Sequence, residues 1–337
     1  MINVTLYSRE DCHLCAKAWQ DLQELQAEVP HNLTVINVDT DPDLRQAYGF
    51  EVPVVEIGPY KLRAPFGQQE LKVTLLAAQD RKDQLEELDS QRYANQVTRR
   101  QTWSKTDGFT YWLCRHYLAI FNLVVLIYVG LPVLAPAMMH YGLEAPARVI
   151  YKVYGGVCHQ FAYRSFFIFG EQAVYPREVA GVSGVMTFNQ ATGLSEDATG
   201  EVQLAAREFI GSERSGYKVA LCQRDVSIYA AILLFGILYA LAGRRIPAIP
   251  WYVWVVIGLV PIGIDGTSQL LSKPPFSFYP LRESTPLLRV VTGGLFGFTT
   301  AWFGYPMVEQ TMAEARQILA AKLIRLRSGS TPRQPAD

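Results

Sequence analysis

A run of 23 residues without a charged side chain, Tyr117–Met139, constrains the fold of this chain more than any other feature. A helix of that length can cross the ~30 Å hydrocarbon core of a bilayer. Three more apolar segments follow, at about 226–242, 250–271 and 288–308. We therefore predict an all-α transmembrane bundle with about four spans in residues 116–310.

Basic residues predict the orientation of these spans, because Lys and Arg collect on the cytoplasmic side of a membrane. They lie before the first span, after the second and after the fourth: Arg99, Arg100, Lys105, Arg115, Arg244, Arg245 and the segment 316–327. We expect an integral protein of a bacterial-type plasma membrane whose N-terminal head and C-terminus are cytoplasmic. Residues 311–337 are predicted to form an amphipathic helix and a disordered tail.

The segments 140–224 and 272–286 then lie outside the cell. Residues 149–170 have an apolar face that polar side chains interrupt, and a fifth span would place the C-terminus opposite the head. We interpret 149–170 as an interfacial or re-entrant helix. Residues 171–218 are predicted to be a polar outer loop with a helix near Gly200–Phe209.

The first 110 residues differ from the rest, because they are charged and polar. Lys plus Arg and Asp plus Glu both number 31, and no basic recognition motif is present, so nucleic acid is not an expected partner. Met1–Ser8 reads as a strand without a basic or apolar signal region. We therefore expect no cleaved signal peptide, and a head that stays in the cytoplasm.

Strand and helix patterns alternate within residues 1–78. Strands are predicted at 3–7, 33–38, 52–57 and 61–64, and helices after Cys15, after Asp39 and at 69–78. The order βαβαββα is that of the α/β thioredoxin fold. Residues 79–115 are dense in charged side chains and are predicted to be a helical connector.

Cys12 and Cys15 form a Cys-x-x-Cys motif between the first strand and the first helix. A helix amino terminus stabilises a thiolate, so Cys12 is the predicted nucleophile and Cys15 the resolving thiol. Half of a structural zinc site and an incidental pair are the alternatives, but the head lacks a second Cys/His pair at ligand spacing.

Cys12-His13-Leu14-Cys15, followed by Val52-Pro53-Val54, resembles the glutaredoxin-like branch of the thioredoxin superfamily. The resemblance implies a cis Pro53 that faces the dithiol, and a free backbone before it that pairs with a bound thiol substrate. His13 either stabilises the thiolate as a cation or is simply solvated. The implied partners are a thiol- or disulfide-bearing protein or a small thiol, with glutathione or a thioredoxin-type reductant. Pro65–Gln69 replaces the segment that holds glutathione in ordinary glutaredoxins.

Polar residues gather near the predicted outer edge of the membrane domain, where charges are costly and mark candidate functional sites. They are Cys158, His159, Arg164, Cys222, Arg224, Asp265, Gln269, Glu283 and Arg289. These residues belong to four short motifs: Cys-His-Gln with Arg-Ser, Cys-x-Arg, Asp-Gly-x-x-Gln and Glu-Ser-Thr. The set of motifs resembles a family of bacterial and archaeal membrane proteins designated a domain of unknown function, DUF2085. That family implies no activity.

Several roles are open for this cluster. Cys158 and Cys222 either form a disulfide, bind zinc together with His159 and an acidic residue, or act as a redox pair served by a quinone or by the head. The charged residues either hold the bundle together as an ion-pair network or bind an anionic headgroup or phosphate. The sequence favours a membrane-anchored thiol–disulfide oxidoreductase. The alternative is a transporter or lipid-directed enzyme whose head is a redox regulator.

Overall fold

The computed structural model describes residues 1–89, 91, 98–99, 102–195 and 200–327. Its chain divides into two compact units, Met1–His116 with Gln310–Asp337, and Tyr117–Glu309. Each unit is described by itself below. Some predictions concern residues outside the described ranges. These residues are Arg100, part of the charged connector and the end of the C-terminal tail that is predicted to be disordered.

The first unit contains the predicted thioredoxin fold. Its strands are β1 (Ile2–Ser8), β2 (His31–Asn37), β3 (Val54–Ile57) and β4 (Tyr60–Arg63). They form one sheet in the order β2-β1-β3-β4, in which β1 and β2 are parallel and the other neighbours are antiparallel. The helices are α1 (His13–Leu25), α2 (Pro42–Tyr48) and α3 (Gln68–Leu88), with a short 3-10 turn, η1 (Val38–Thr40), before α2. The predicted order βαβαββα is confirmed.

The side chains of β1 alternate between two cores. Val4 and Leu6 pack on one face of the sheet with Leu22 of α1 and with Leu71 and Leu75 of α3. Because successive strand residues point to opposite faces, the neighbouring Tyr7 belongs to the other core.

The second core of this unit includes the far end of the chain. Ala320 and Ala321, in the last turns of α12 (Pro286–Arg327), are buried with Tyr7 and Leu44. A buried ion pair between Arg316 Nε and Asp43 Oδ1, 3.0 Å apart, lies in the same unit. The predicted helix in 311–337 is therefore the end of α12, and the head completes its core with it.

The predicted end of the last head helix at residue 78 is wrong. Helix α3 continues to Leu88, because residues 79–88 contain no Gly or Pro and consist mainly of good helix formers. The first part of the predicted connector therefore belongs to this helix.

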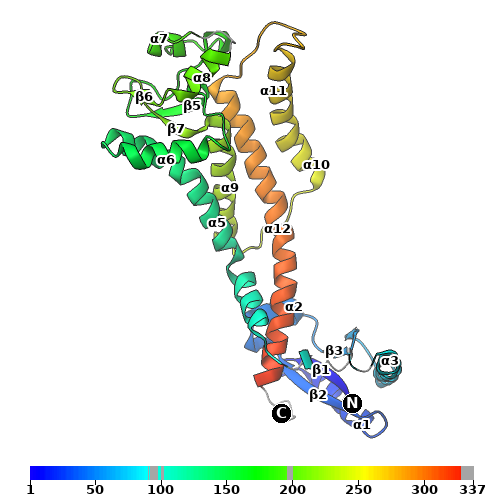
Figure 1. Ribbon diagram of the computed structural model, residues 1–337. Helices are drawn as coiled ribbons and strands as arrows, with labels where there is room; N and C mark the ends of the chain where they lie inside the picture. The colour runs from blue at the N-terminus through cyan, green and yellow to red at the C-terminus, as the bar shows by residue number, and fades with distance from the viewer. Residues whose placement is uncertain (90, 92–97, 100–101, 196–199, 328–337) are drawn as a thin grey trace. The chain divides into compact units, whose positions relative to one another are not determined.

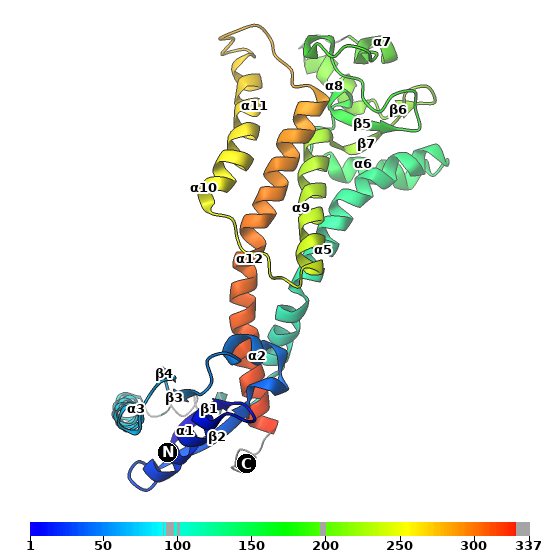
Figure 2. The ribbon, with the colours of Figure 1, turned by 180° about the vertical axis from the view of Figure 1, so that it is seen from behind.

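The second unit contains most of the membrane helices. Among the residues that the structure describes, three helices have the length and composition of membrane spans: α5 (Lys105–His140), α9 (Gln223–Leu241) and the continuous helix Trp251–Leu271. The last comprises α10 (Trp251–Val253), the π-helical turn η4 (Trp254–Leu259) and α11 (Val260–Leu271). The predicted span at 288–308 lies within α12, which is not among the three, and it stays a prediction. Helices α5, α9 and α12 run alongside one another in both views (Figure 1, Figure 2).

A small mixed subdomain lies between α5 and α9 in sequence. It contains α6 (Glu144–Tyr154), η2 (Ala162–Arg164), β5 (Ser165–Ile168), η3 (Glu178–Ala180), α7 (Phe188–Thr192), α8 (Gly200–Glu208), β6 (Gly211–Ser212) and β7 (Gly216–Cys222). The three strands form a sheet in the order β5-β7-β6.

Two expectations about this region are therefore wrong. Residues 149–170 are not one helix, since α6 ends at Tyr154 and the chain continues into η2 and a strand. The segment 171–218 contains the predicted helix, as α8, but the rest of it is not simply a loop, because β7 pairs with both β5 and β6. The domain is helical in its spans but not all-α.

Helices α9 and α12 approach closely at Gly293 and Gly297, which are four residues apart on α12. A Cβ atom on Gly293 would lie 2.8 Å from the Arg224 carbonyl oxygen, and one on Gly297 would overlap the backbone of Ile228. Small residues at such positions let two helix backbones meet.

We expect Gly297→Ala to destabilise the membrane domain by about 1–3 kcal/mol, the usual cost of overpacking. Gly304→Ala, on the same helix, is the matched control, because a Cβ atom there meets nothing within 4 Å. The measurement is unfolding of the detergent-solubilised chain by heat or by SDS. Equal stability of the two variants would contradict this packing.

Candidate functional sites

Cys12 and Cys15 stand at the start of α1 and are joined by a disulfide. Cys12 is the N-cap residue, and its Sγ accepts a hydrogen bond from the Cys15 amide at 3.2 Å. Cys15 is fully buried, whereas Cys12 is partly exposed. The sulfur that a substrate can reach is therefore the one at the helix amino terminus, where a thiolate is stabilised.

The segment before β3 is placed against the same end of the sheet. Tyr7 near the end of β1 pairs with Val54, so Pro53 lies next to the strand end that leads to Cys12. The Val52–Pro53 bond is cis, as predicted. The Val52 amide, however, donates to the Tyr48 carbonyl at 3.1 Å, so the expectation of a wholly free backbone before Pro53 is wrong for this N–H. His13 is exposed.

The polar residues predicted in the membrane domain gather around one cavity of about 430 Å³. Those that line it are Cys158, His159, Arg164, Cys222, Arg224, Gln269 and Arg289, together with Val157, Gln160, Phe161, Asp225, Gly266, Leu270 and Lys273. The two remaining predicted residues, Asp265 and Glu283, bind arginines of this wall. Segments far apart in sequence therefore form a single site.

Glu283 is the centre of one ion-pair network, and its side chain is only 2% exposed. Arg164 binds it with two parallel hydrogen bonds, of 2.8 Å to Oε1 and 3.0 Å to Oε2. Arg289 also donates to Glu283, and Arg177 lies 3.7 Å from it. The Arg289 Nε donates to the Ser284 carbonyl at 3.2 Å. One buried carboxylate thus faces three guanidinium groups.

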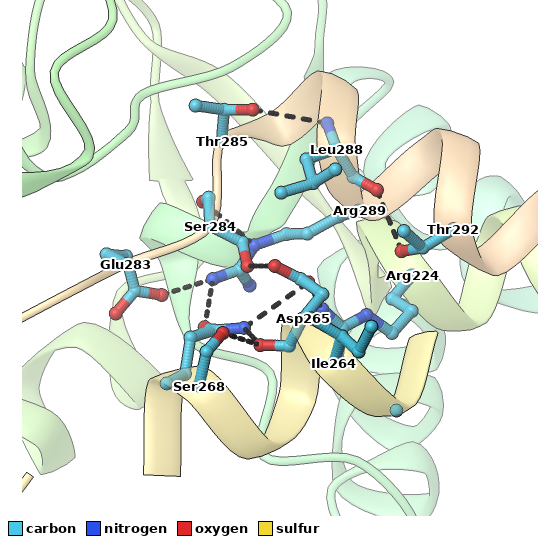
Figure 3. Close-up of polar contacts among 12 residues, drawn as sticks. Arg224, Ile264, Asp265, Ser268, Glu283, Ser284, Thr285, Leu288, Arg289 and Thr292 are labelled. Atoms are coloured by element: carbon cyan, nitrogen blue, oxygen red, sulfur yellow. Dashed lines mark hydrogen bonds and ion pairs between the residues drawn. The ribbon is translucent and has the colours of Figure 1, made fainter. Parts of the chain in front are cut away.

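Asp265 of α11 is the centre of the second network (Figure 3). Arg224 of α9 and the Ser284 hydroxyl donate to its carboxylate, and Arg282 Nη2 lies 3.2 Å from Oδ1. Gln269, one turn later, donates to the Asp265 carbonyl at 3.0 Å. These contacts join the spanning helices α9 and α11 to the segment that precedes α12.

The two cysteines of the cavity are free thiols that lie side by side. The Sγ atoms of Cys158 and Cys222 and a carboxylate oxygen of Asp225 all lie within 4.8 Å of one another. A hydrogen bond from Cys222 lowers the pKa of Cys158, and the same bond raises the pKa of Cys222. The disulfide that was one of the alternatives for these two cysteines is not formed in this structure. His159 lines the cavity but is not part of this group of ligand atoms.

Two family models match the chain. Residues 3–87 match the glutaredoxin-like domain (DUF836), and residues 203–303 match the predicted membrane protein family DUF2085. The chain joins a glutaredoxin-like domain to a DUF2085 domain. The DUF2085 match includes Cys222, Arg224, Asp265, Glu283 and Arg289, whereas Cys158, His159 and Arg164 precede it.

Two similar proteins were found. An uncharacterized protein from Methanocaldococcus jannaschii is 26% identical over 202 residues, which cover 57% of this chain and 92% of that protein. A structural genomics target protein from X. campestris, solved by X-ray crystallography, is 36% identical. It matches 22% of this chain and 96% of its own, with a TM-score of 0.20.

The predicted set of site residues around the DUF2085 domain omitted several side chains. Ser284 lies within the Glu-Ser-Thr motif and Asp225 directly follows the Cys-x-Arg motif, so their positions were the available signal. Arg282 and Lys273 lie between motifs, and Arg177 comes from the segment interpreted as a loop. Their role depends on the tertiary fold, which brings three separate segments to one cavity.

Lys218 of β7 is a further buried cation that the sequence did not reveal. It is 1% exposed, and its ammonium group donates to the Gln160 carbonyl at 2.8 Å. Burial lowers the pKa of Lys218 to about 7. Because Gln160 lines the cavity, this lysine supports the cavity wall from behind.

Proposed function

We propose that the protein is a membrane-anchored thiol–disulfide oxidoreductase in which Cys12 is the nucleophile and Cys15 the resolving thiol. The observation that carries this proposal is the placement of the two sulfurs. Cys12 is partly exposed at the amino terminus of α1, and Cys15 is buried directly behind it. The glutaredoxin-like match over residues 3–87 supports the same chemistry.

The reaction consumes the reduced dithiol. The Cys12 thiolate attacks a substrate disulfide, so that a mixed disulfide forms and one substrate sulfur leaves as a thiolate. Cys15 then loses its proton and attacks Cys12 Sγ, which releases the second substrate thiolate and leaves the Cys12–Cys15 disulfide. Two electrons have passed to the substrate, and an external thiol of the glutathione or thioredoxin type restores the dithiol.

The surface around the motif favours a disulfide-bearing protein as the substrate. Leu14 lies within the motif and is 52% exposed, and Phe50 precedes the Val52–Pro53 bond and is fully exposed. At the amino terminus of α3, the Glu70 carboxylate accepts a hydrogen bond from the Gly67 amide at 3.3 Å. An internal carboxylate at this helix end disfavours a second anion, such as a glutathione carboxylate, at the same place.

Mixed-disulfide trapping tests the assignment of the two roles. In membranes that contain the full-length chain, Cys15→Ser is expected to accumulate adducts on Cys12, because the resolving thiol is missing. Cys12→Ser is expected to accumulate none. Non-reducing electrophoresis with mass spectrometry of the adducts is the measurement, and adducts on Cys15 alone would reverse the assignment.

The charge around the cavity favours a second candidate function, in which the membrane domain binds an anionic ligand and the head regulates it. The described residues of the cavity wall and its two networks include more cations than carboxylates: Arg164, Arg177, Arg224, Lys273, Arg282 and Arg289 against Asp225, Asp265 and Glu283. Arginine pairs well with phosphate and carboxylate groups. A transporter or lipid-directed enzyme for phosphate-containing substrates would have such a site.

Lys273 provides the test of anion binding. Burial and the nearby Arg164 lower its pKa, and within the described residues no carboxylate lies at ion-pairing distance. Anion binding needs the protonated amine, so affinity is expected to fall as pH rises through this lowered pKa.

Lys273→Gln is expected to weaken binding of a phosphate-bearing probe by about 10-fold, the value of one charge-assisted hydrogen bond. It should also flatten the alkaline limb of the pH profile. The exposed Lys152→Gln is the matched control. Calorimetry with inorganic phosphate and with vesicles containing phosphatidic acid separates a free phosphate from a lipid headgroup. Unchanged affinity for both would exclude Lys273 from an anion site.

A further inference from the structure

The thiol pair of the membrane domain is built like part of a metal site. Cys222 is the N-cap residue of α9, and Asp225 lies in the first turn of that helix. Cys158 reaches the same point from the turn after α6, where its amide bonds to the Tyr154 carbonyl at 2.9 Å. Two independent segments therefore hold two sulfurs and one carboxylate oxygen within 4.8 Å of one another.

We propose that Cys158, Cys222 and Asp225 bind a zinc-class divalent cation whose fourth coordination position opens into the cavity. Zinc takes thiolate sulfur at about 2.3 Å and carboxylate oxygen at about 2.0–2.2 Å in a tetrahedral arrangement. Ligands on a common ion then lie roughly 3–4 Å apart, so these three atoms need only small side-chain adjustments.

The charge of the surroundings agrees with this site. Two thiolates and one carboxylate around a divalent cation leave a net charge of −1. The arginines of the cavity wall, Arg164, Arg224 and Arg289, complement that charge. A bare cation would be repelled there, whereas the complete thiolate complex is stabilised.

The number of protein ligands decides the type of site. Three protein ligands with an open fourth position are the arrangement of catalytic zinc, in contrast to the closed four-ligand sites that only stabilise a fold. Because the fourth position of the metal faces the cavity, a water molecule or an anionic substrate group can occupy it. His159 lines the cavity as well, but its ring is not within this ligand group.

Metal titration of the full-length chain in detergent tests the proposal. The background is Cys12→Ser with Cys15→Ser, which removes the only other cysteine pair. After reduction and removal of metal by a chelator, Co²⁺ is expected to bind at one ion per chain with a thiolate-to-cobalt charge-transfer band, and Zn²⁺ to displace it. Cys158→Ser and Cys222→Ser should each abolish the band, whereas Cys114→Ser, outside the cavity, should keep it.

Asp225→Asn keeps the shape of the side chain and removes its charge. This variant therefore tests the metal site even if a cysteine variant does not fold. It is expected to weaken Zn²⁺ binding by at least about 10-fold, since even indirect partners of a metal ligand contribute that much. Circular dichroism and gel filtration report on folding. The proposal fails if the reduced chain binds no metal or if the cysteine variants bind it unchanged. It also fails if Cys158 and Cys222 form a disulfide that resists reduction and so excludes the metal.

Discussion

Cys12→Ser is expected to lower the disulfide-reductase activity of the full-length chain by more than about 10³-fold, because the substitution removes the attacking sulfur. Cys12 Sγ is the accessible sulfur and stands at the amino terminus of α1, where the helix stabilises the thiolate. A serine hydroxyl at this position is not ionised at neutral pH. The measurement is reduction of a chromogenic disulfide by the detergent-solubilised chain with a thiol reductant.

The control for this prediction is Cys114→Ser, which removes a buried cysteine that lies outside the motif and is not disulfide-bonded. It is expected to keep the wild-type rate. Cys15→Ser should keep the first attack and lose turnover with protein disulfides, because the mixed disulfide is not resolved. If Cys12→Ser keeps full activity in a folded chain, the chemistry does not take place at this motif.

Glu283→Gln is expected to destabilise the membrane domain by about 3–5 kcal/mol, the cost of breaking a buried ion pair. The Glu283 carboxylate faces Arg164, Arg177 and Arg289, whose side chains are 22%, 8% and 5% exposed. A neutral amide would leave these guanidinium groups to repel one another in a poorly hydrated place. Resistance of the membrane domain to heat or to SDS is the measurement.

Glu171→Gln is the matched control for Glu283→Gln, because it removes the same charge from an ion pair in the same unit. Glu171 and Arg214 are 3.3 Å apart, but their side chains are 52% and 64% exposed. Exposed pairs contribute less than about 1 kcal/mol, so the control should be nearly neutral. Equal effects of the two substitutions would show that the Glu283 network does not hold the bundle.

The thioredoxin fold of the head was predictable from local patterns. The strands and the starts of the helices near Cys12 and Asp41 lie close to their predicted places. The docking of Ala320 and Ala321 into the head was not predictable, because small residues give no periodic apolar signal. This contact joins residues more than 250 positions apart.

Three of the predicted spans coincide with long apolar helices, and most of the predicted polar residues line one cavity, but the way in which those residues pair was not predictable. Hydropathy identifies α5 and α9, because a long apolar run has one main explanation. The sheet of β5, β6 and β7 was missed, since the pairing of β5 with β7 is non-local and β6 has only two residues. The position of Asp225 beside the two thiols, in place of His159, likewise depends on where α9 begins.

The central claim is that Cys12 and Cys15 form a working redox pair in the intact membrane protein. A redox titration in vesicles of known orientation tests it most directly, with differential thiol labelling and mass spectrometry of each cysteine. The proposal predicts that Cys12 and Cys15 change state together as a two-electron couple, and that they are labelled from the cytoplasmic face. Cysteines that stay reduced, or stay locked as a disulfide, across the whole range of a folded chain would contradict it.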